Sequence, residues 1–269
     1  MKLGIVVASE NALPSAFAVF RGIKESAPIV HELGYDGMEL ALKDPNEISR
    51  EDLRVLLKRN SLEVSAISTG QVFASRGLMF TDEDPERRKE LFDSFTGFID
   101  LASDFGGLVN VGRVRGSLDG RSMDVCEQLF LDLMGKVLDY AQEKGVTIIL
   151  EPVNRYEIDY INNTDEGARL VEKVSRPNFK LMLDVFHMNI EDARIGEAIE
   201  RNANCIRYIH LADSNRHAAG DGHLDFDEVF SSLKRIGFDS WCTVECLPFP
   251  DARTAAQRSA KYLRERYFA

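Results

Sequence analysis

The sequence predicts an α/β protein, a single (β/α)8 barrel that spans residues 1–269. Short apolar, β-branched segments alternate with longer amphipathic segments along the whole chain, a pattern typical of a parallel sheet with helical crossovers. Eight such pairs can be traced, and 269 residues is a common length for one closed barrel. Residues 8–11 lack the glycine-rich turn that an open, nucleotide-binding sheet would need after its first strand.

The eight predicted strands are residues 3–7, 37–40, 63–67, 108–111, 147–151, 180–184, 207–211 and 242–245. A helix is predicted after each strand, at residues 18–33, 49–59, 85–105, 123–144, 165–175, 192–203, 226–236 and 252–266. Acidic residues open the second and fifth of these helices, where the helix dipole favours them. Asp84 followed by Pro85 is a typical start for the third helix, and Gly34, Gly145 and Gly237 stand where helices should stop.

The composition favours a small-molecule partner. The formal net charge is −11 and no dense Lys/Arg run is present, which argues against nucleic acid as a partner.

No apolar stretch approaches the roughly 20 residues of a membrane span, and the apolar run in residues 1–8 is too short for a signal peptide. The four cysteines lack zinc-type spacing and are interpreted as free thiols. We therefore expect a cytoplasmic protein.

Four consecutive predicted strands end in residues that can bind a metal. The fifth to eighth strands carry Glu151, Asp184, His210 and Glu245, at separations of 33, 26 and 35 residues that each fit one βα unit. In a barrel of this kind the functional groups lie at the carboxyl ends of the strands. Strand alternation also places Glu151, His210 and Glu245 on the inward face.

Three carboxylates that point into one barrel mouth would repel one another unless a cation compensates. Oxygen ligands with one imidazole suit Mn²⁺ best here, with Mg²⁺ or Co²⁺ as alternatives. The simpler interpretation is that these acids cap neighbouring helices or pair with arginines.

The order of the strands also indicates a chemistry. Strands five and eight are three steps apart in the ring, so Glu151 and Glu245 should approach a bound carbon from opposite sides. Two opposed bases can remove a proton from one face and return one to the other, as an epimerase must. A metal would polarise the neighbouring carbonyl and stabilise the enediolate.

Four segments of the C-terminal half resemble one known family. These are residues 151–157 (EPVNRYE), 184–189 (DVFHMN), 210–216 (HLADSNR) and 245–246 (EC). As a set, and in this order, they are similar to the ketose 3-epimerases of the D-tagatose and D-psicose group, within the xylose-isomerase-like TIM-barrel superfamily.

The resemblance implies an enzyme that inverts the C3 centre of a ketose. It implies that Glu151 and Glu245 are acid/base residues that also bind the metal, and that Asp184 and His210 complete the ligand set. It further implies that Glu157, His187 and Arg216 hold the O1 and O2 end of the sugar. A homodimer or homotetramer is the assembly that the resemblance implies.

The pocket wall from the second to fourth strands is less well defined. Glu39, residues 69–71 and residues 112–116 end these strands, and any of them could line the pocket. If the fourth strand extends far enough, Arg113 and Arg115 share one face and could receive a distal phosphate or carboxylate of the substrate. The alternative is a solvated loop with salt bridges.

Four other functions are alternatives. A sugar (phosphate) isomerase or an inosose-type dehydratase could use the same single-metal site. An apurinic-site DNA endonuclease of the same superfamily uses three zinc ions, and residues 221–223 (DGH), with His187, resemble part of its metal set. However, the third and fourth strands lack the histidines that those enzymes have at their ends. A non-catalytic binding protein is the last possibility.

Overall fold

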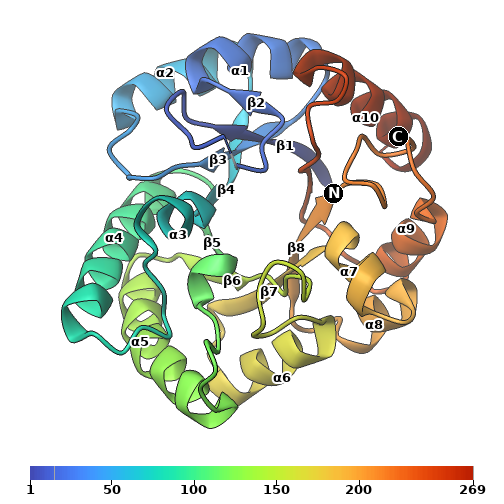
Figure 1. The fold of residues 1–269 in the computed structure, drawn as a ribbon. Coiled ribbons are helices and arrows are strands. Elements are labelled where there is room, and N and C mark those ends of the chain that lie inside the picture. Colours follow the sequence, from blue (N-terminus) through green and yellow to red (C-terminus); the bar gives the residue numbers. More distant parts are fainter. Residues whose placement is uncertain (15, 269) are drawn as a thin grey trace.

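Eight parallel strands close into a barrel, and an outer ring of helices surrounds it (Figure 1), in a computed structural model that describes residues 1–14 and 16–268. The ring order is β1-β3-β4-β5-β6-β7-β8-β9, and β9 pairs with β1 to close it. The predicted (β/α)8 fold is thereby confirmed. The strands are β1 Lys2–Ala8, β3 Gly37–Ala41, β4 Glu63–Ser68, β5 Leu108–Val111, β6 Thr147–Leu150, β7 Phe179–Asp184, β8 Ile206–Leu211 and β9 Trp241–Val244.

The helices of the outer ring follow the strands as the sequence predicts. They are α1 Ile23–Glu32, α2 Arg50–Asn60, α4 Pro85–Asp104, α5 Met123–Glu143, α6 Thr164–Val174, α8 Ile195–Arg201, α9 Phe226–Arg235 and α10 Ala252–Tyr267. The N-cap of α4 is Asp84, whose side chain accepts a hydrogen bond from the Glu86 N–H, and Pro85 is the first helical residue. Within the described part of the chain, no helix has both the length and the apolar character to cross a membrane.

The first helix begins later than predicted. Residues 18–33 were expected to be helical, but Phe20–Arg21 forms a two-residue strand, β2, that pairs with β1 outside the ring. Helix α1 therefore starts only at Ile23.

Three short helical segments at the carboxyl ends of strands were not predicted. They are α3 Gly70–Arg76 after β4, the 3-10 turn η1 Arg113–Arg115 after β5, and α7 Val185–Glu191 after β7. All three lie at the end of the barrel where the candidate ligands gather.

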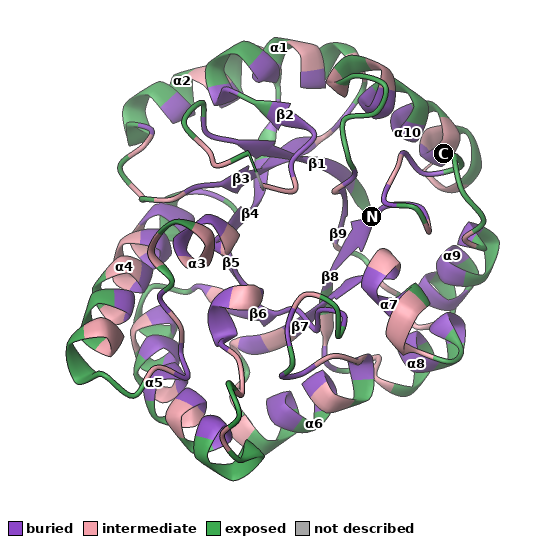
Figure 2. Ribbon diagram, in the orientation of Figure 1, coloured by how far each residue is buried: buried purple, intermediate pink, exposed green. Residues whose placement is uncertain are grey.

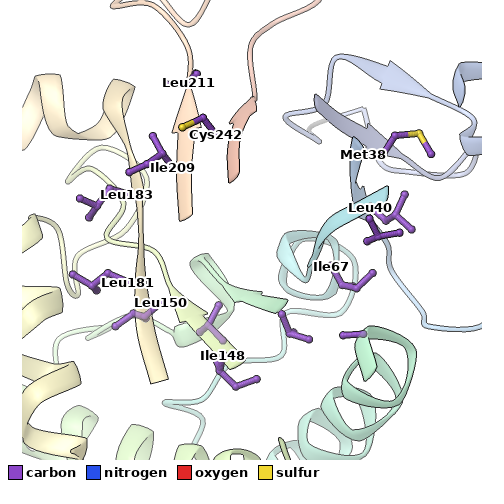
Figure 3. Packing of buried hydrophobic residues seen from close by; sticks show 14 of the residues in the cluster. Met38, Leu40, Ile67, Ile148, Leu150, Leu181, Leu183, Ile209, Leu211 and Cys242 are labelled. Carbon is purple, nitrogen blue, oxygen red and sulfur yellow. The ribbon is translucent and has the colours of Figure 1, made fainter. Parts of the chain in front are cut away.

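Side chains alternate across each strand between two cores. Ile148, Leu150, Leu181 and Leu183 belong to the large apolar cluster that the strands share with the helices (Figure 3). The residues between them point into the barrel, where Ala66, Leu108, Ile149, Met182, Tyr208 and Trp241 form a smaller cluster. The strands are buried along almost their whole length (Figure 2), as expected for a parallel barrel.

A polar layer follows the inner apolar cluster toward the carboxyl end. The Tyr208 hydroxyl lies 2.7 Å from Ser65 Oγ, 2.6 Å from Thr243 Oγ1 and 2.8 Å from Glu39 Oε2. Glu39 in turn lies against His210. This layer forms the floor of the candidate site.

Candidate active site

The four predicted metal ligands converge at the carboxyl end of the barrel. Glu151, Asp184, His210 and Glu245 each offer one ligand atom, and these atoms all lie within 4.8 Å of one another. Asp184 ends β7 and His210 lies in β8, whereas Glu151 and Glu245 follow one residue after β6 and β9. Strand pairing still holds both glutamates in place, because their N–H groups donate to Val111 and Leu211 carbonyls at 3.1 and 3.0 Å.

Buried negative charge in this cluster is partly balanced by Arg216. Its Nη1 lies 2.5 Å from Asp184 Oδ2, and its Nη2 contacts Glu245 Oε2. The other oxygen of Asp184 caps α7 by accepting from the Phe186 N–H at 2.8 Å. Helix capping and arginine pairing, the simpler interpretation of these acids, thus both occur at Asp184. Neither explains why Glu151, with 7% of its surface exposed, is buried beside them.

The histidine is oriented by a carboxylate beneath it. Glu39 Oε2 accepts a hydrogen bond from His210 Nε2 at 2.7 Å. His210 Nδ1 is buried and has no hydrogen-bond partner in the described part of the chain. It faces Glu245 Oε2 at 3.3 Å and oxygens of Glu151 and Asp184 at 3.8 Å. A buried ring nitrogen aimed at three carboxylates fits a divalent cation.

Burial and neighbouring charges shift the pKa values of the carboxyl groups in this cluster. Burial raises the pKa of the Glu151 carboxyl to about 8; His210 opposes this, while Glu245 and Asp184 add to it. Burial acts in the same direction on Asp184, but Arg216, His187 and His210 outweigh it and hold the pKa of Asp184 below its usual value. Two neighbouring carboxyl groups therefore differ in protonation at neutral pH.

The predicted substrate-binding residues line the pocket above this cluster. His187 Nδ1 lies 2.7 Å from Asn154 Nδ2, which can only donate, so the ring must carry its hydrogen on Nε2. Burial lowers the pKa of His187 to about 3, which keeps the ring neutral. Its Nε2 lies 3.8 Å from Glu151 Oε1. Asn154 also donates to Glu157 Oε1 at 3.2 Å, so one amide orients two of the predicted residues.

The pocket wall agrees only partly with the sequence prediction. Glu39 does not line the pocket but lies below it, under His210. The lining residues are Ala16, Phe17, Ala41, Ser68, Gly70, Gln71, Asn110, Gly112, Arg113, Glu151, Val153, Glu157, His187, Arg216 and Glu245.

Arg113 and Arg115 would share one face only if the fourth predicted strand reached them, and it does not. Residues 113–115 form the turn η1 instead of extending β5, so strand alternation does not apply to them. Arg115 is fully buried and donates to the carbonyls of Tyr160, Gly112, Glu151 and Ile161 at 2.6, 3.0, 2.9 and 2.7 Å. Only Arg113 reaches the pocket.

Several residues of the site were not assigned a role from the sequence. Phe17 and Phe186 enclose the Arg216 guanidinium, whose Cζ lies 5.3 and 4.8 Å from the two ring centroids. Asn110 Nδ2 lies 3.4 Å from Glu151 Oε2. Asn154 lies within the segment EPVNRYE, so the resemblance of this segment to a known family could have pointed to it. Phe17 lies in an irregular segment, where no periodic pattern marks it.

The residues that resemble an endonuclease metal set do not assemble one. His223 Nδ1 lies 2.9 Å from Ser214 Oγ, and Asp221 pairs with Arg258 at 2.9 Å. Among residues 1–14 and 16–268, the group around His210 is the only one with three or more candidate metal ligands close together.

Known proteins resemble this chain over most of its length. The family model for the xylose isomerase-like TIM barrel matches residues 28–266. The ketose 3-epimerase of Arthrobacter globiformis is 31% identical over 222 residues, which cover 81% of this chain and 75% of the relative. The L-ribulose 3-epimerase of Methylomonas sp. (strain DH-1) is 33% identical over 218 residues, 79% of this chain and 74% of the relative.

A solved structure supports the same fold. The D-allulose 3-epimerase from Methylomonas sp., in complex with D-allulose, superimposes with a TM-score of 0.82 and 23% identity, covering 99% of this chain and 98% of the other. The resemblance inferred from the four sequence segments is thus confirmed by matches that also include the N-terminal half. The chain belongs to the xylose isomerase-like TIM barrel family, and sugar 3-epimerases are among its relatives.

Proposed function

We propose that this protein is a metal-dependent ketose 3-epimerase, which inverts the C3 centre by proton exchange through an enediolate. The observation that carries the proposal is the buried cluster itself. Two glutamates from β6 and β9 meet around a histidine nitrogen that lacks a hydrogen-bond partner among the described residues. The relatives named as ketose and L-ribulose 3-epimerases add independent support.

The metal proposed for this site is Mn²⁺, held by Glu151, Asp184, His210 and Glu245. Three carboxylates and one imidazole form a donor set that suits Mn²⁺, Mg²⁺ or Co²⁺ better than a thiolate-preferring ion. When bound there, such an ion would stabilise negative charge that develops on the substrate oxygens.

Glu151 and Glu245 are the proposed acid/base pair. They come from strands three positions apart in the ring, so they reach a bound carbon from different sides. One carboxylate removes the proton at C3, and the other, in its protonated form, returns a proton to the opposite face. Burial raises the pKa of Glu151 in the metal-free protein and a bound cation would lower it again, so this carboxyl can exchange protons near neutral pH.

His187, Arg216 and Glu157 are proposed to hold the O1 and O2 end of the sugar. The tautomer fixed by Asn154 leaves the Nε2–H of His187 free to donate to a substrate oxygen. Arg216 is held between two aromatic rings beside the cluster, where it can donate to a developing oxyanion. Burial raises the pKa of Glu157, although Arg113 and Arg216 oppose the rise, so this residue can share a proton with a hydroxyl.

Turnover in D₂O tests the mechanism. Free and phosphorylated ketoses are incubated with the Mn²⁺-loaded protein, and the products are analysed by NMR. We expect deuterium at the inverted carbon, and we expect Glu151→Gln and Glu245→Gln to abolish inversion while the fold persists. Product without solvent deuterium would favour an isomerase that transfers hydrogen within the substrate, and loss of water from an inosose would indicate a dehydratase.

The cellular compartment and the oligomeric state can also be proposed. We propose a cytoplasmic protein, because all four cysteines are free and buried, as is usual where thiols stay reduced. A homodimer or homotetramer is the proposed assembly, and light scattering of the purified protein would measure it.

A further inference from the structure

We propose that Arg113 binds an anionic group, a carboxylate or a phosphate, at the end of the sugar remote from the metal ligands. The inference rests on the proposed function, because it assumes a sugar held with its O1 and O2 end at Arg216. It assigns to this pocket a substrate class, acidic or phosphorylated ketoses.

The guanidinium of Arg113 is a pocket cation whose charge acts on Glu157 without forming an ion pair with it in the described part of the chain. It lines the same pocket as Glu151 and Glu245, and no carboxylate in the described part of the chain forms an ion pair or hydrogen bond with it. Arg216, the other arginine of this pocket, is in contrast paired with two carboxylates. The five N–H donors of an arginine in a half-buried position need acceptors, and a ligand in the pocket can supply them.

Two aromatic rings lie beside the Arg113 guanidinium. Its Cζ lies 5.9 Å from the ring centroid of Phe17 and 5.7 Å from that of Phe73. Rings can stabilise the charge of a guanidinium and fix its plane, but they accept none of its hydrogen bonds in that plane. Within residues 1–14 and 16–268, no hydrogen bond from these N–H donors to a side chain or carbonyl is present.

The backbone that carries Arg113 is fixed from below. Arg115, in the same turn, donates to four carbonyl groups, two of them on the 160–161 loop segment. At Gly116 the φ angle is 100°, and a Cβ there would lie 1.9 Å from Thr81 Oγ1, so the turn packs tightly against its neighbour. A donor on such a rigid turn loses little freedom when it binds a ligand.

Arg113 lies on a different side of the barrel mouth from the candidate metal ligands. The candidate metal ligands come from β6 to β9, whereas Arg113 follows β5 and Phe73 lies in α3 after β4. The Phe17 ring lies beside both arginines, with Arg216 at the cluster and Arg113 on the β4–β5 side. A ketose held at O1 and O2 by Arg216 would extend its other end toward Arg113.

An anionic ligand complements the Arg113 guanidinium best. A planar guanidinium matches the two oxygens of a carboxylate or phosphate with parallel hydrogen bonds, and charge strengthens each bond. A neutral hydroxyl group accepts one such bond and gains no charge attraction. The two anions share this chemistry, so the experiment compares them.

The test measures kcat/KM for three compounds with one carbon skeleton: D-fructose, D-fructose 6-phosphate and its 6-carboxylate analogue, D-fructuronate. Wild-type protein with Mn²⁺ should favour at least one anionic compound over D-fructose. Arg113→Met, which keeps the apolar stem between the rings, should remove a preference of roughly 10- to 100-fold, the usual range for a charge-assisted bidentate pair. The loss of kcat/KM for D-fructose in this variant should be smaller than the loss for the favoured anionic compound.

Two further variants sharpen the comparison. Arg113→Lys should keep part of the preference, because it retains the charge without the planar fork. Arg59→Met, an exposed arginine on α2, should leave all three values unchanged. The favoured anion identifies the source: D-fructuronate indicates an acidic sugar and the 6-phosphate a sugar phosphate. Equal loss for all three compounds in Arg113→Met, or no loss for any, overturns the inference.

Direct binding separates this inference from the epimerase proposal. Calorimetric titration of the same compounds into metal-free wild-type and Arg113→Met protein needs no turnover. If no ketose is epimerised but the anionic compounds bind more weakly to Arg113→Met, the proposed function fails and the anion site stands. If ketoses are epimerised and binding of both anions is independent of Arg113, the anion site fails alone.

Discussion

At the scale of single residues, Glu39 is a buried carboxylate that orients one of the candidate metal ligands, His210. It is fully buried, accepts from both His210 Nε2 and the Tyr208 hydroxyl, and leaves its Oε1 without a partner in the described part of the chain. A buried carboxylate in this state is costly. Its contact with His210 offers a reason for its presence, because it leaves Nδ1 as the nitrogen that faces the three acids.

Replacing this carboxylate should therefore weaken metal binding. We expect Glu39→Gln to lower Mn²⁺ affinity about 10- to 100-fold, the usual effect of losing a group that orients a metal-binding histidine. Calorimetric titration of Mn²⁺ would measure it. Tyr208→Phe is the matched control: it removes the other hydrogen bond to Glu39 and should have a smaller effect. Equal affinity in Glu39→Gln and wild type would show that Glu39 does not position His210.

Metal affinity should also depend on pH. Because burial raises the pKa of Glu151 to about 8 in the metal-free protein, its carboxyl mostly holds a proton at neutral pH, and an incoming cation must displace it. Affinity should thus rise with pH through about 8. Titrations in buffers with different heats of ionisation would report the released proton. A constant affinity between about pH 6 and pH 8, with no proton release, would contradict this assignment.

The sequence was sufficient for the residues whose position follows from strand order alone. Glu151, Asp184, His210 and Glu245 each stand at a strand end, and closure of the barrel brings them together. Glu39 was one of several residues that could line the pocket, and it lies below the pocket because its side chain is bonded to His210. Phe17 could not be found, since its place depends on tertiary contacts of an irregular segment.

At the scale of elements, Arg115 joins three segments that carry the site. Its guanidinium binds carbonyls of the β5 turn, of Glu151 at the end of β6, and of residues 160 and 161 in the following loop. Burial lowers its pKa to about 10, so it remains charged at neutral pH. This one side chain supports Arg113 on one side and the backbone of Glu151 on the other.

Removal of this guanidinium should destabilise the fold. In Arg115→Met the buried carbonyls lose their donors, and we expect the free energy of unfolding to fall by about 3 kcal/mol or more. Urea denaturation would measure the change. Arg113→Met is the control from the same turn, and it should alter stability by less than about 1 kcal/mol, since no hydrogen bond is lost. Similar effects of the two substitutions would mean that Arg115 is not a structural tie.

Local sequence pattern explains which elements were predictable. Except for α8, the helices of the outer ring carry an apolar face that repeats along several turns, and the strands carry β-branched alternation, so both leave a signal. The segments α3, η1 and α7 are too short for periodicity to be read. They are held by bonds to distant parts of the chain instead, such as those from Arg115 to the Glu151 and Ile161 carbonyls at η1 and the contact of Asn154 with His187 in α7.

At the scale of the whole molecule, the closed barrel makes the stability of the fold depend on whether a cation occupies the site. The four candidate ligands come from neighbouring strands β6 to β9, so a cation bound to all of them would link half of the ring at its carboxyl end. Without it, three acids share the positive charge of Arg216 and His210. The chain also has a net charge of −11, so a bound cation reduces repulsion in the folded state.

Metal binding should therefore raise thermal stability. A ligand that binds only the folded state at 100 times its Kd adds about 2.7 kcal/mol, which for a chain of this size raises the Tm by about 5 °C. Calorimetric scans of the purified protein with excess Mn²⁺, and after treatment with EDTA, would measure the shift. His210→Ala should melt at the same temperature in both conditions, because it lacks the ligand that Glu39 orients. A Tm increase of equal size in His210→Ala would place the bound ion elsewhere on the acidic surface, and the cluster at the barrel mouth would then not be the metal site.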